Sequence, residues 1–321
     1  MLESIVDIGS NSVRMTVYDC DPCAASWEPF FKLKKQLGLA SHLDPVTGCL
    51  DEDGIQDLAR AINEYRRSAA HFVEMNHFAC FATAAVRNST NREEVLKRVK
   101  DECGVDVELL SGQDEARLGF LGAMWHSGQT SGVQVDVGGG SSEVLLYADG
   151  RAGNAVSVPL GSLSLFEKYV NDLLPGTNEA KTIHDAVGKR VRKALGTGAF
   201  ECASCIGGSA RALRKVRNAW FGTSDRKAPV TKDELDEIVE RIVRKPKTAM
   251  RDLLRVVPER IHTFAPGILA IQAVAENFSV ARLVVHDSGI REGYLMSRIL
   301  GIDPGSDVNN PQARRHDDVE R

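Results

Sequence analysis

The sequence predicts an α/β protein made of two domains with similar folds. One pattern occurs twice: an apolar run ends in an aspartate, a glycine turn with serine follows, and a second apolar run leads away. The copies are residues 7–18 and 136–147, so the offset is 136 − 7 = 129 residues. Because this offset is about the length of one domain, the repeat indicates a duplicated domain.

Each copy is typical of a β-hairpin whose turn can bind an anion. The second turn holds Gly138, Gly139 and Gly140, and consecutive glycines permit positive φ and expose a row of backbone N–H groups. Asp136 and Glu143 flank this turn, and two carboxylates suit Mg²⁺ or the activation of water. A plain glycine-rich hairpin is the alternative for this segment alone, but the second copy argues against it.

Composition excludes several classes of protein. The 321 residues, 43% of them hydrophobic, can bury two ordinary cores. A net charge of −4 and a pI near 6.1 give no general attraction to nucleic acid or anionic membranes. No apolar run approaches the ~20 residues that span a bilayer, and the acidic N-terminus enters a strand at once, unlike a signal peptide. We therefore expect a cytoplasmic protein with no nucleic-acid or membrane partner.

Four of the seven cysteines form two C-x-x-C pairs, Cys20/Cys23 and Cys202/Cys205. Two such pairs could close a zinc site. However, Cys202 and Cys205 lie in an apparent strand, where alternation directs their thiols to opposite faces. Reduced cysteines are the favoured interpretation.

The first part of the chain predicts three strands followed by alternating helices and strands, which is an α/β arrangement. The expected strands are 5–8, 13–18, 30–37, 77–83 and 105–110, and the expected helices are 55–75 and 92–102. Ser111 can then cap a helix running to about Trp125, with Glu115 in its first turn. On spacing alone, Glu115 is interpreted as a solvated acidic residue favoured by the helix dipole.

The linker 127–132, rich in glycine and serine, marks the start of the second domain. After the second hairpin, the expected strands are 156–160, 202–206 and 282–286. Helices are expected at 177–195, after Gly207-Gly208-Ser209, and after the capping box of Thr231 and Glu234. Two more are expected at 265–278 and from Gly289 to about Leu300. A strand–Gly-Gly–helix turn can hold a nucleoside or another phosphate. The polar tail 303–321 is expected to be disordered.

Several short motifs together resemble one family. They are Asp7-Ile-Gly-Ser-Asn-Ser12, Ala82-Thr-Ala-Ala-Val-Arg87, Leu110-Ser-Gly-Gln-Asp-Glu-Ala-Arg117, Asp136-Val-Gly-Gly-Gly-Ser-Ser-Glu143, Pro159-Leu-Gly161, Ile206-Gly-Gly-Ser209 and Gly289-Ile-Arg-Glu-Gly293. In this order they resemble the exopolyphosphatase/guanosine pentaphosphate phosphohydrolase (Ppx/GppA) family of the actin-like ATPase superfamily, in its short two-domain form.

The resemblance implies two actin-like (ribonuclease H-like) α/β domains with a cleft between them. Domain I is expected at residues 1–126, with a C-terminal helix at about 290–301 packing back on it, and domain II at 127–289. The turns Gly9–Ser12 and Gly138–Ser141 are expected to face each other across the cleft.

The resemblance also implies roles for individual residues. Glu115 matches the catalytic base, and Asp136 and Glu143 match carboxylates near Mg²⁺ and the attacking water. The phosphate-binding residues are Gly9, Ser10, Asn11, Ser12, Arg87, Gly138, Gly139, Gly140 and Ser141. Weaker candidates for substrate contact are Arg14, Gly207, Gly208, Ser209, Arg260 and Arg291. His286-Asp287-Ser288-Gly289 departs from the family's usual Ser-Asp-Tyr-Gly, which could alter what the site accepts.

The implied activity is release of terminal phosphate from inorganic polyphosphate or guanosine pentaphosphate, by Mg²⁺-assisted attack of water. The sequence does not separate these two substrates, and a homodimer is expected from the family alone. Two alternatives stay open: a small-molecule kinase or ATPase of the same superfamily, and a non-catalytic sensor of polyphosphate or the guanosine nucleotide.

Overall fold

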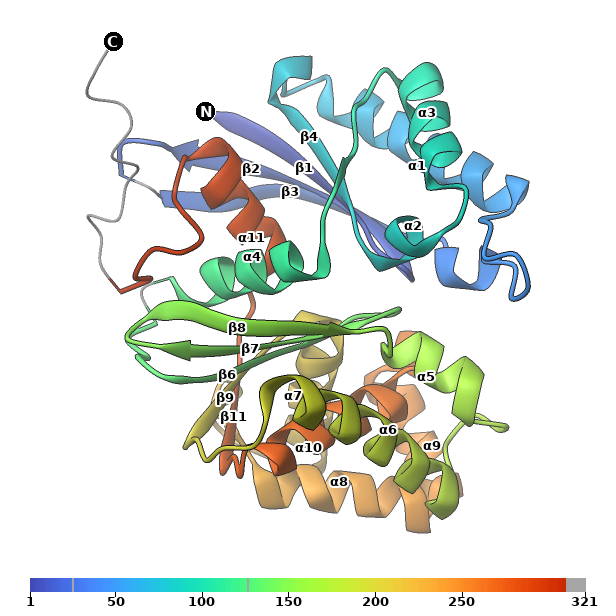
Figure 1. The fold of residues 1–321 in the computed structure, drawn as a ribbon, viewed down its shortest axis with the longest axis vertical. Coiled ribbons are helices and arrows are strands. Elements are labelled where there is room, and N and C mark those ends of the chain that lie inside the picture. Colours follow the sequence, from blue (N-terminus) through green and yellow to red (C-terminus); the bar gives the residue numbers. More distant parts are fainter. Residues whose placement is uncertain (25, 126, 310–321) are drawn as a thin grey trace. The chain divides into compact units, whose positions relative to one another are not determined.

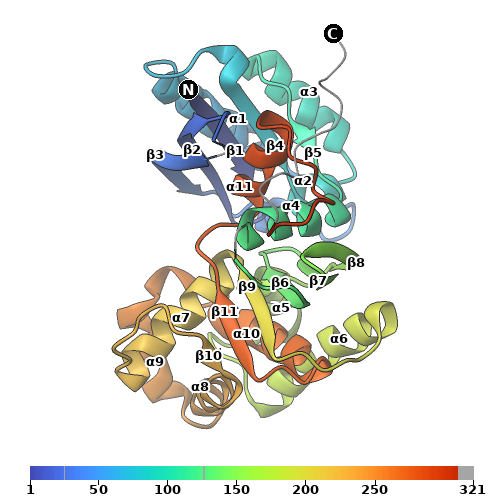
Figure 2. The same ribbon diagram turned by 90° about the vertical axis from the view of Figure 1, so that its left-hand side faces the viewer.

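The structure is a computed structural model that describes residues 1–24, 26–125 and 127–309. Its contacts divide the chain into two units, one spanning Met1–Asp114 and the other beginning at Glu115. Each unit is built around one β-sheet with helices packed on it (Figures 1 and 2). The two units are described separately below.

The first unit has a five-stranded sheet in the order β3-β2-β1-β4-β5. Its strands are β1 (Leu2–Ile8), β2 (Ser12–Asp21), β3 (Ser26–Gln36), β4 (Phe78–Ala82) and β5 (Glu108–Leu109). Its helices are α1 (Glu52–Ala69), α2 (Ala84–Asn88) and α3 (Arg92–Cys103), with 3₁₀ turns at Leu39–His42 and Met75–His77. β1, β2 and β3 form an antiparallel meander, whereas β4 and β5 run parallel to β1.

Strand alternation decides which side chains of the first sheet are buried under α1. Val13 and Met15 of β2 belong to the same core cluster as Leu58 and Ile62 of α1. The Tyr65 hydroxyl of α1 donates to the Val13 carbonyl over 2.9 Å. Since neighbouring residues point to opposite faces, the residues between these positions lie on the face away from α1.

The second unit has a six-stranded sheet in the order β10-β11-β9-β6-β7-β8. Its strands are β6 (Gly132–Val137), β7 (Ser142–Ala148), β8 (Arg151–Val158), β9 (Cys202–Ile206), β10 (Val230–Thr231) and β11 (Arg282–Val285). Its helices are α4 (Gly112–Met124), which starts at the end of the first unit, and α5 (Ser162–Tyr169), α6 (Thr177–Leu195), α7 (Gly207–Phe221), α8 (Lys232–Arg244), α9 (Pro246–Val256), α10 (Phe264–Asn277) and α11 (Ile290–Tyr294). A 3₁₀ turn at Pro258–Arg260 precedes α10, and a π-helical turn at Leu295–Ile299 follows α11.

The second sheet repeats the strand order of the first. β6, β7 and β8 form the antiparallel meander, β9 pairs parallel with β6, and β11 pairs parallel with β9. Only β10 is additional, as a short antiparallel strand at the edge. The predicted duplication of an α/β fold is therefore confirmed at the level of topology.

The two faces of the second sheet have different coverings. Val133, Val135 and Val137 of β6 belong to the core cluster that includes α10, and α10 in turn contacts α5, α6, α7 and α8. The alternate residue Gln134 faces α4, where its side-chain amide donates to the Ala116 carbonyl over 3.3 Å. Asp136 is two residues after Gln134 on the same strand and therefore also lies on the α4 face. Figure 2 shows α7, α8 and α9 grouped together in this unit.

Helices α4 and α11 approach so closely that their contact requires glycine. A Cβ on Gly122 would overlap the carbonyl of Gly289, and a Cβ on Gly293 would overlap the carbonyl of Leu118. The Glu292 carboxylate accepts from the Gly289 N–H over 2.8 Å and fixes the start of α11. This contact gives the Gly-Ile-Arg-Glu-Gly motif a structural reason. The packing of the last helix on domain I stays a prediction.

Several predicted boundaries differ from the structure. The helix expected to reach Met75 ends at Ala69, because the later apolar residues Phe72 and Met75 are exposed and continue no buried stripe. The strand expected over 105–110 shortens to β5. The division by contacts falls before Glu115, so most of α4 is grouped with the second unit. The domain boundary expected after residue 126 stays a prediction.

Helix α9 and the start of the tail were missed. Pro246 ends α8 as expected, but it also occupies the first turn of α9, where its missing N–H costs nothing. The prediction of a disordered tail is wrong for 303–309: Val308 is fully buried and its N–H donates to the Gly150 carbonyl, and the Asn309 amide donates to the Gln129 carbonyl. Residues 310–321 lie outside the described part of the chain.

Within the described residues the cysteines form no disulfide, and Cys205 lies in the core cluster while Cys202, on the same strand, is only half-buried. The opposite orientation expected for this C-x-x-C pair is thus consistent with the structure. Within residues 1–24, 26–125 and 127–309, no helix is long and apolar enough to cross a membrane.

We expect Gly293→Ala to lower the free energy of unfolding by at least about 2 kcal/mol, because its Cβ meets backbone that cannot move aside. The matched control is Gly188→Ala in α6, where the nearest atom is the Ala273 Cβ at 3.9 Å. That variant should be neutral or up to about 1 kcal/mol more stable. Urea unfolding of both variants measures the difference, and equal stabilities would contradict the close contact of α4 and α11.

Candidate active site

The start of α5 binds the carbonyls of the turn between β6 and β7. Within the turn, the Gly138 N–H donates to the Ser141 carbonyl over 2.9 Å. The Gly138 carbonyl accepts from both the N–H and the hydroxyl of Ser162, at 2.8 and 2.9 Å, and the Gly139 carbonyl accepts from the Leu163 N–H at 2.9 Å. In the described part of the chain the N–H groups of Gly139 and Gly140 have no protein acceptor. A row of such N–H donors is able to bind an anion.

Gly161 lies directly against this turn. A Cβ there would overlap the backbone of Gly139 and lie 2.5 Å from the Ser141 nitrogen. The Ser142 hydroxyl donates to the Leu160 carbonyl over 2.6 Å, so the turn is bound to this segment from both sides. The Pro159-Leu160-Gly161 motif therefore shapes the turn between β6 and β7, a role that the spacing did not reveal.

The turn between β1 and β2 follows the same plan with different supports. The Gly9 N–H donates to the Ser12 carbonyl over 3.2 Å, as Gly138 does to Ser141. The Ser10 carbonyl accepts from the Ala40 N–H at 2.9 Å, and the Asn11 carbonyl accepts from Gly38 at 3.1 Å. The carbonyls are thus again engaged by a following segment.

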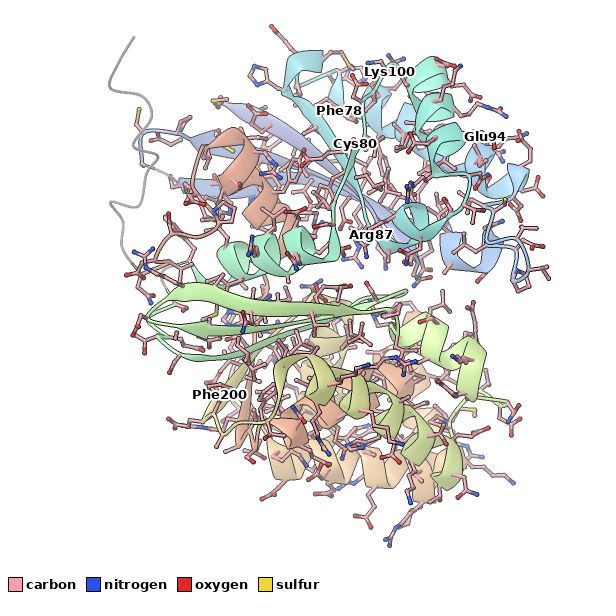
Figure 3. The ribbon with its side chains drawn as sticks, in the orientation of Figure 1. Phe78, Cys80, Arg87, Glu94, Lys100 and Phe200 are labelled. Atoms are coloured by element: carbon pink, nitrogen blue, oxygen red, sulfur yellow. The ribbon has the colours of Figure 1, made fainter. Side chains whose placement is uncertain are left out.

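Two arginines accompany this turn in the first unit. The Arg14 Nε donates to the Ser12 hydroxyl over 3.1 Å. Arg87 lies on α2 (Figure 3), and its guanidinium donates to the Leu110 carbonyl over 2.9 Å. β4, which leads into α2, is tied to the end of β1 because the Thr83 N–H donates to the Ile8 carbonyl.

The decisive difference between the two hairpins lies in one cross-strand pair. Asp7 stands directly opposite Arg14, whereas Asp136 stands directly opposite Glu143. Directly opposed residues have Cβ atoms ~5 Å apart on one face, and like charges there are destabilising. The first pair joins a carboxyl group to a guanidinium, whereas the second joins two carboxyl groups.

Glu143 is buried among polar and acidic groups. Its side chain is 3% exposed and accepts from the Ser157 hydroxyl over 2.6 Å. Burial raises the pKa of Glu143 well above its ordinary value, and the charges of Glu115 and Asp136 raise this pKa further. Hydrogen bonds from Ser157 and Ser141 oppose the rise. The groups that act most strongly on Glu143 are therefore carboxylates and hydroxyls.

Glu115 reaches the same site from the first turn of α4. The helix is capped as predicted: the Ser111 hydroxyl donates to the Asp114 carboxylate over 2.6 Å, and the Asp114 N–H donates back to that hydroxyl over 3.1 Å. Glu115 itself is only 9% exposed and acts electrostatically on Glu143. The interpretation of Glu115 as a solvated residue is wrong, because this face of α4 lies against the sheet.

A third loop completes the surroundings of Asp136. Gly207 has φ = 81°, and a Cβ there would overlap the Asp136 carboxylate. A Cβ on Gly208 would overlap the Arg260 guanidinium, and the Ser209 hydroxyl donates to the Val137 carbonyl over 2.9 Å. The Gly-Gly-Ser turn thus places the start of α7 beside Asp136 and brings Arg260 against Gly208.

The carboxylates fit a magnesium ion held partly by substrate. Among the described residues, no group of three or more His, Cys, Asp or Glu side chains is arranged as a metal site. Mg²⁺ is commonly held by one or two carboxylates together with water and substrate phosphates. Asp136 and Glu143, directly opposed on neighbouring strands, suit that kind of coordination.

The family model for the Ppx/GppA phosphatase family matches residues 17–301. The chain belongs to this family. Exopolyphosphatase 1 of Mycobacterium tuberculosis is 27% identical over 303 residues, which cover 92% of this chain and 87% of the relative. A guanosine-5'-triphosphate,3'-diphosphate pyrophosphatase of Aeromonas hydrophila is 25% identical, over 97% of this chain and 62% of that protein.

Solved structures agree with the fold. The crystal structure of the Aquifex aeolicus member of the Ppx/GppA family superposes with a TM-score of 0.78 at 25% identity, covering 94% of this chain and 98% of that one. An exopolyphosphatase from Cytophaga hutchinsonii gives a TM-score of 0.79 at 18% identity, over 95% and 100% of the chains, which supports the fold alone. The predicted family and actin-like α/β fold are confirmed.

Within this Ppx/GppA member, the predicted site residues fall into two groups. The second unit holds Glu115, Asp136, Glu143, the turn 138–141, the turn 207–209 and Arg260 near one another; the first unit holds the turn 9–12, Arg14 and Arg87. Arg291 lies on α11, on a different element from the carboxylates. Ser157 was missed, because only the pairing of β7 with β8 places it opposite Glu143.

Without a metal, the contribution of Glu143 to the free energy of unfolding should fall as pH rises. The folded protein keeps the Glu143 proton to higher pH than the unfolded chain does. The Glu143 contribution is therefore full below about pH 4.5 and is lost as pH rises through the raised pKa of Glu143. Glu143→Gln stays neutral and should flatten this part of the profile, whereas Mg²⁺ should stabilise only the wild-type protein at high pH. Urea unfolding with EDTA or Mg²⁺ measures both effects.

The exposed Glu74 provides the control, since Glu74→Gln should keep the wild-type pH profile. A Glu143→Gln profile that matches the wild type in EDTA would contradict the raised pKa.

Proposed function

We propose that this protein releases terminal phosphate from a phosphoanhydride chain, inorganic polyphosphate or guanosine pentaphosphate, by attack of water. The observation that carries the proposal is the opposed pair of Asp136 and Glu143 beside a turn with available N–H donors. The names of the mycobacterial and Aeromonas relatives support this class of substrate.

Each part of the site has a task in phosphoryl transfer. The N–H groups of Gly139 and Gly140 bind phosphate oxygens and stabilise the charge that develops on them. Glu115, on a rigid helix turn, takes the proton of the attacking water. Its proximity to other carboxylates favours a proton acceptor, because an added proton relieves repulsion among them.

Asp136 and Glu143 would hold Mg²⁺, which neutralises phosphate charge when it is bound. Ser157 orients Glu143 through its hydroxyl, and Gly207 leaves room for the Asp136 carboxylate. Arg260, against Gly208, adds a positive group on the same side of Asp136. The contribution of the first-unit turn, facing the second-unit turn across a cleft, stays a prediction, as do a cytoplasmic location, a homodimer and the absence of nucleic-acid and membrane partners.

We expect Glu115→Gln to fold and bind substrate but to lose about 10²–10⁴ in kcat, because the amide cannot accept the proton of water. The control is Glu93→Gln, an exposed glutamate in the first turn of α3, which should turn over at the wild-type rate. Phosphate release from short polyphosphate, long polyphosphate and guanosine pentaphosphate measures the effect. A Glu115→Gln enzyme above about a tenth of the wild-type rate would exclude Glu115 as the base.

Asp136→Asn should lower turnover in a manner that depends on Mg²⁺. Removing the charge of one ligand weakens the binding of Mg²⁺. We therefore expect the Mg²⁺ concentration that gives half the maximal rate to rise at least about tenfold. Titrations of phosphate release against Mg²⁺ test this, with Asp149→Asn on the β7–β8 turn as a control. An unchanged Mg²⁺ requirement would remove Asp136 from the metal site. Transfer of phosphate to an added acceptor instead of water would favour the kinase alternative.

A further inference from the structure

The first sheet carries a row of charged residues beside its glycine turn. Asp7 on β1 stands opposite Arg14 on β2, and Arg14 stands opposite Lys34 on β3. Directly paired residues share one face of a sheet, and neighbouring strands lie ~4.8 Å apart. The three side chains therefore form one line across the sheet, on the face away from α1.

This line begins at the phosphate-type turn and ends at an open edge. The Arg14 guanidinium is bonded to Ser12 of the turn. β3 is the outermost strand of the sheet, and Lys34 on it is exposed. The backbone after β3 returns to the turn, since Gly38 and Ala40 donate to the carbonyls of Asn11 and Ser10. Positive charge thus continues from the turn toward solvent.

The second sheet has a matching line with the opposite charge. Asp136, Glu143 and Ser157 occupy the positions of Asp7, Arg14 and Lys34. The first line has two positive groups and one negative group, and the second has two negative groups and none positive. The same architecture therefore offers anion-binding groups in one unit and cation-binding groups in the other.

We propose that Lys34 binds the phosphate groups that follow the terminal one in a linear phosphoanhydride substrate. This inference rests on the proposed function, because it assumes that the turn 9–12 receives phosphate. A polyphosphate chain bound at that turn and Arg14 reaches Lys34 next along the line. Each of its phosphate groups carries negative charge. A substrate of only two phosphates ends before it reaches this position.

The neighbouring Lys35 provides a matched control. It lies on the same strand but points to the α1 face, where its ammonium pairs with the Glu64 carboxylate. Lys34→Ala and Lys35→Ala remove the same charge from adjacent positions. Any effect of net charge alone is common to both variants, whereas an effect of position appears only in Lys34→Ala.

The experiment compares KM and kcat for pyrophosphate, tripolyphosphate and long polyphosphate. We expect Lys34→Ala to raise KM for long polyphosphate about threefold to tenfold, with kcat and the pyrophosphate KM unchanged. Lys34→Arg should restore the KM, and Lys35→Ala should keep wild-type values. The KM of Lys34→Ala should also depend less steeply on salt, because one ionic contact is lost.

Binding of fluorescent long polyphosphate to the same proteins in EDTA gives a second readout that needs no turnover. Weaker binding by Lys34→Ala alone supports the proposal even if the wild-type protein hydrolyses neither polyphosphate nor guanosine pentaphosphate, a result that would refute the proposed function instead. Equal binding by Lys34→Ala and Lys35→Ala, or an equal change of KM for every substrate length, would overturn it.

Discussion

The site depends on one unfavourable interaction, the pairing of Asp136 with Glu143 across a β-hairpin. A hairpin places directly opposed side chains ~5 Å apart whatever their charge, so the backbone register forces two carboxylates together. Burial adds to the cost, and the pKa of Glu143 rises as a result. Such an arrangement costs folding free energy unless a cation or a proton occupies it, and local strain of this kind is typical of functional sites.

The backbone around this pair is fixed by contacts that only glycine permits. Gly161 touches the turn 138–141, Gly207 leaves space for Asp136, and Gly293 lets α11 reach α4, the helix that carries Glu115. A side chain at any of these positions would displace backbone or a functional carboxylate. These glycines therefore determine distances within the second unit.

The sequence predicted what is local and missed what depends on pairing. The duplicated hairpin, the cap at Ser111 and the helix 177–195 follow from periodicity and short motifs, and the structure has them. Ser157 could not be found in this way, because nothing near it in the sequence indicates that β8 sets it opposite Glu143. The burial of Glu115 was equally hidden: α4 has apolar residues on several sides, and only packing against the second sheet decides which face is covered.

Duplication explains how one fold came to offer both kinds of binding group. The cross-strand partner of the aspartate is Arg14 in one hairpin and Glu143 in the other, at positions that correspond through the offset of 129 residues, since 14 + 129 = 143. A single substitution at this position changes the local charge by two units while the turn and its N–H donors keep their geometry. Phosphoryl transfer needs anion-binding groups and carboxylates for metal and water. A repeated hairpin can supply both, because its turn presents backbone N–H groups while the cross-strand pair sets the local charge.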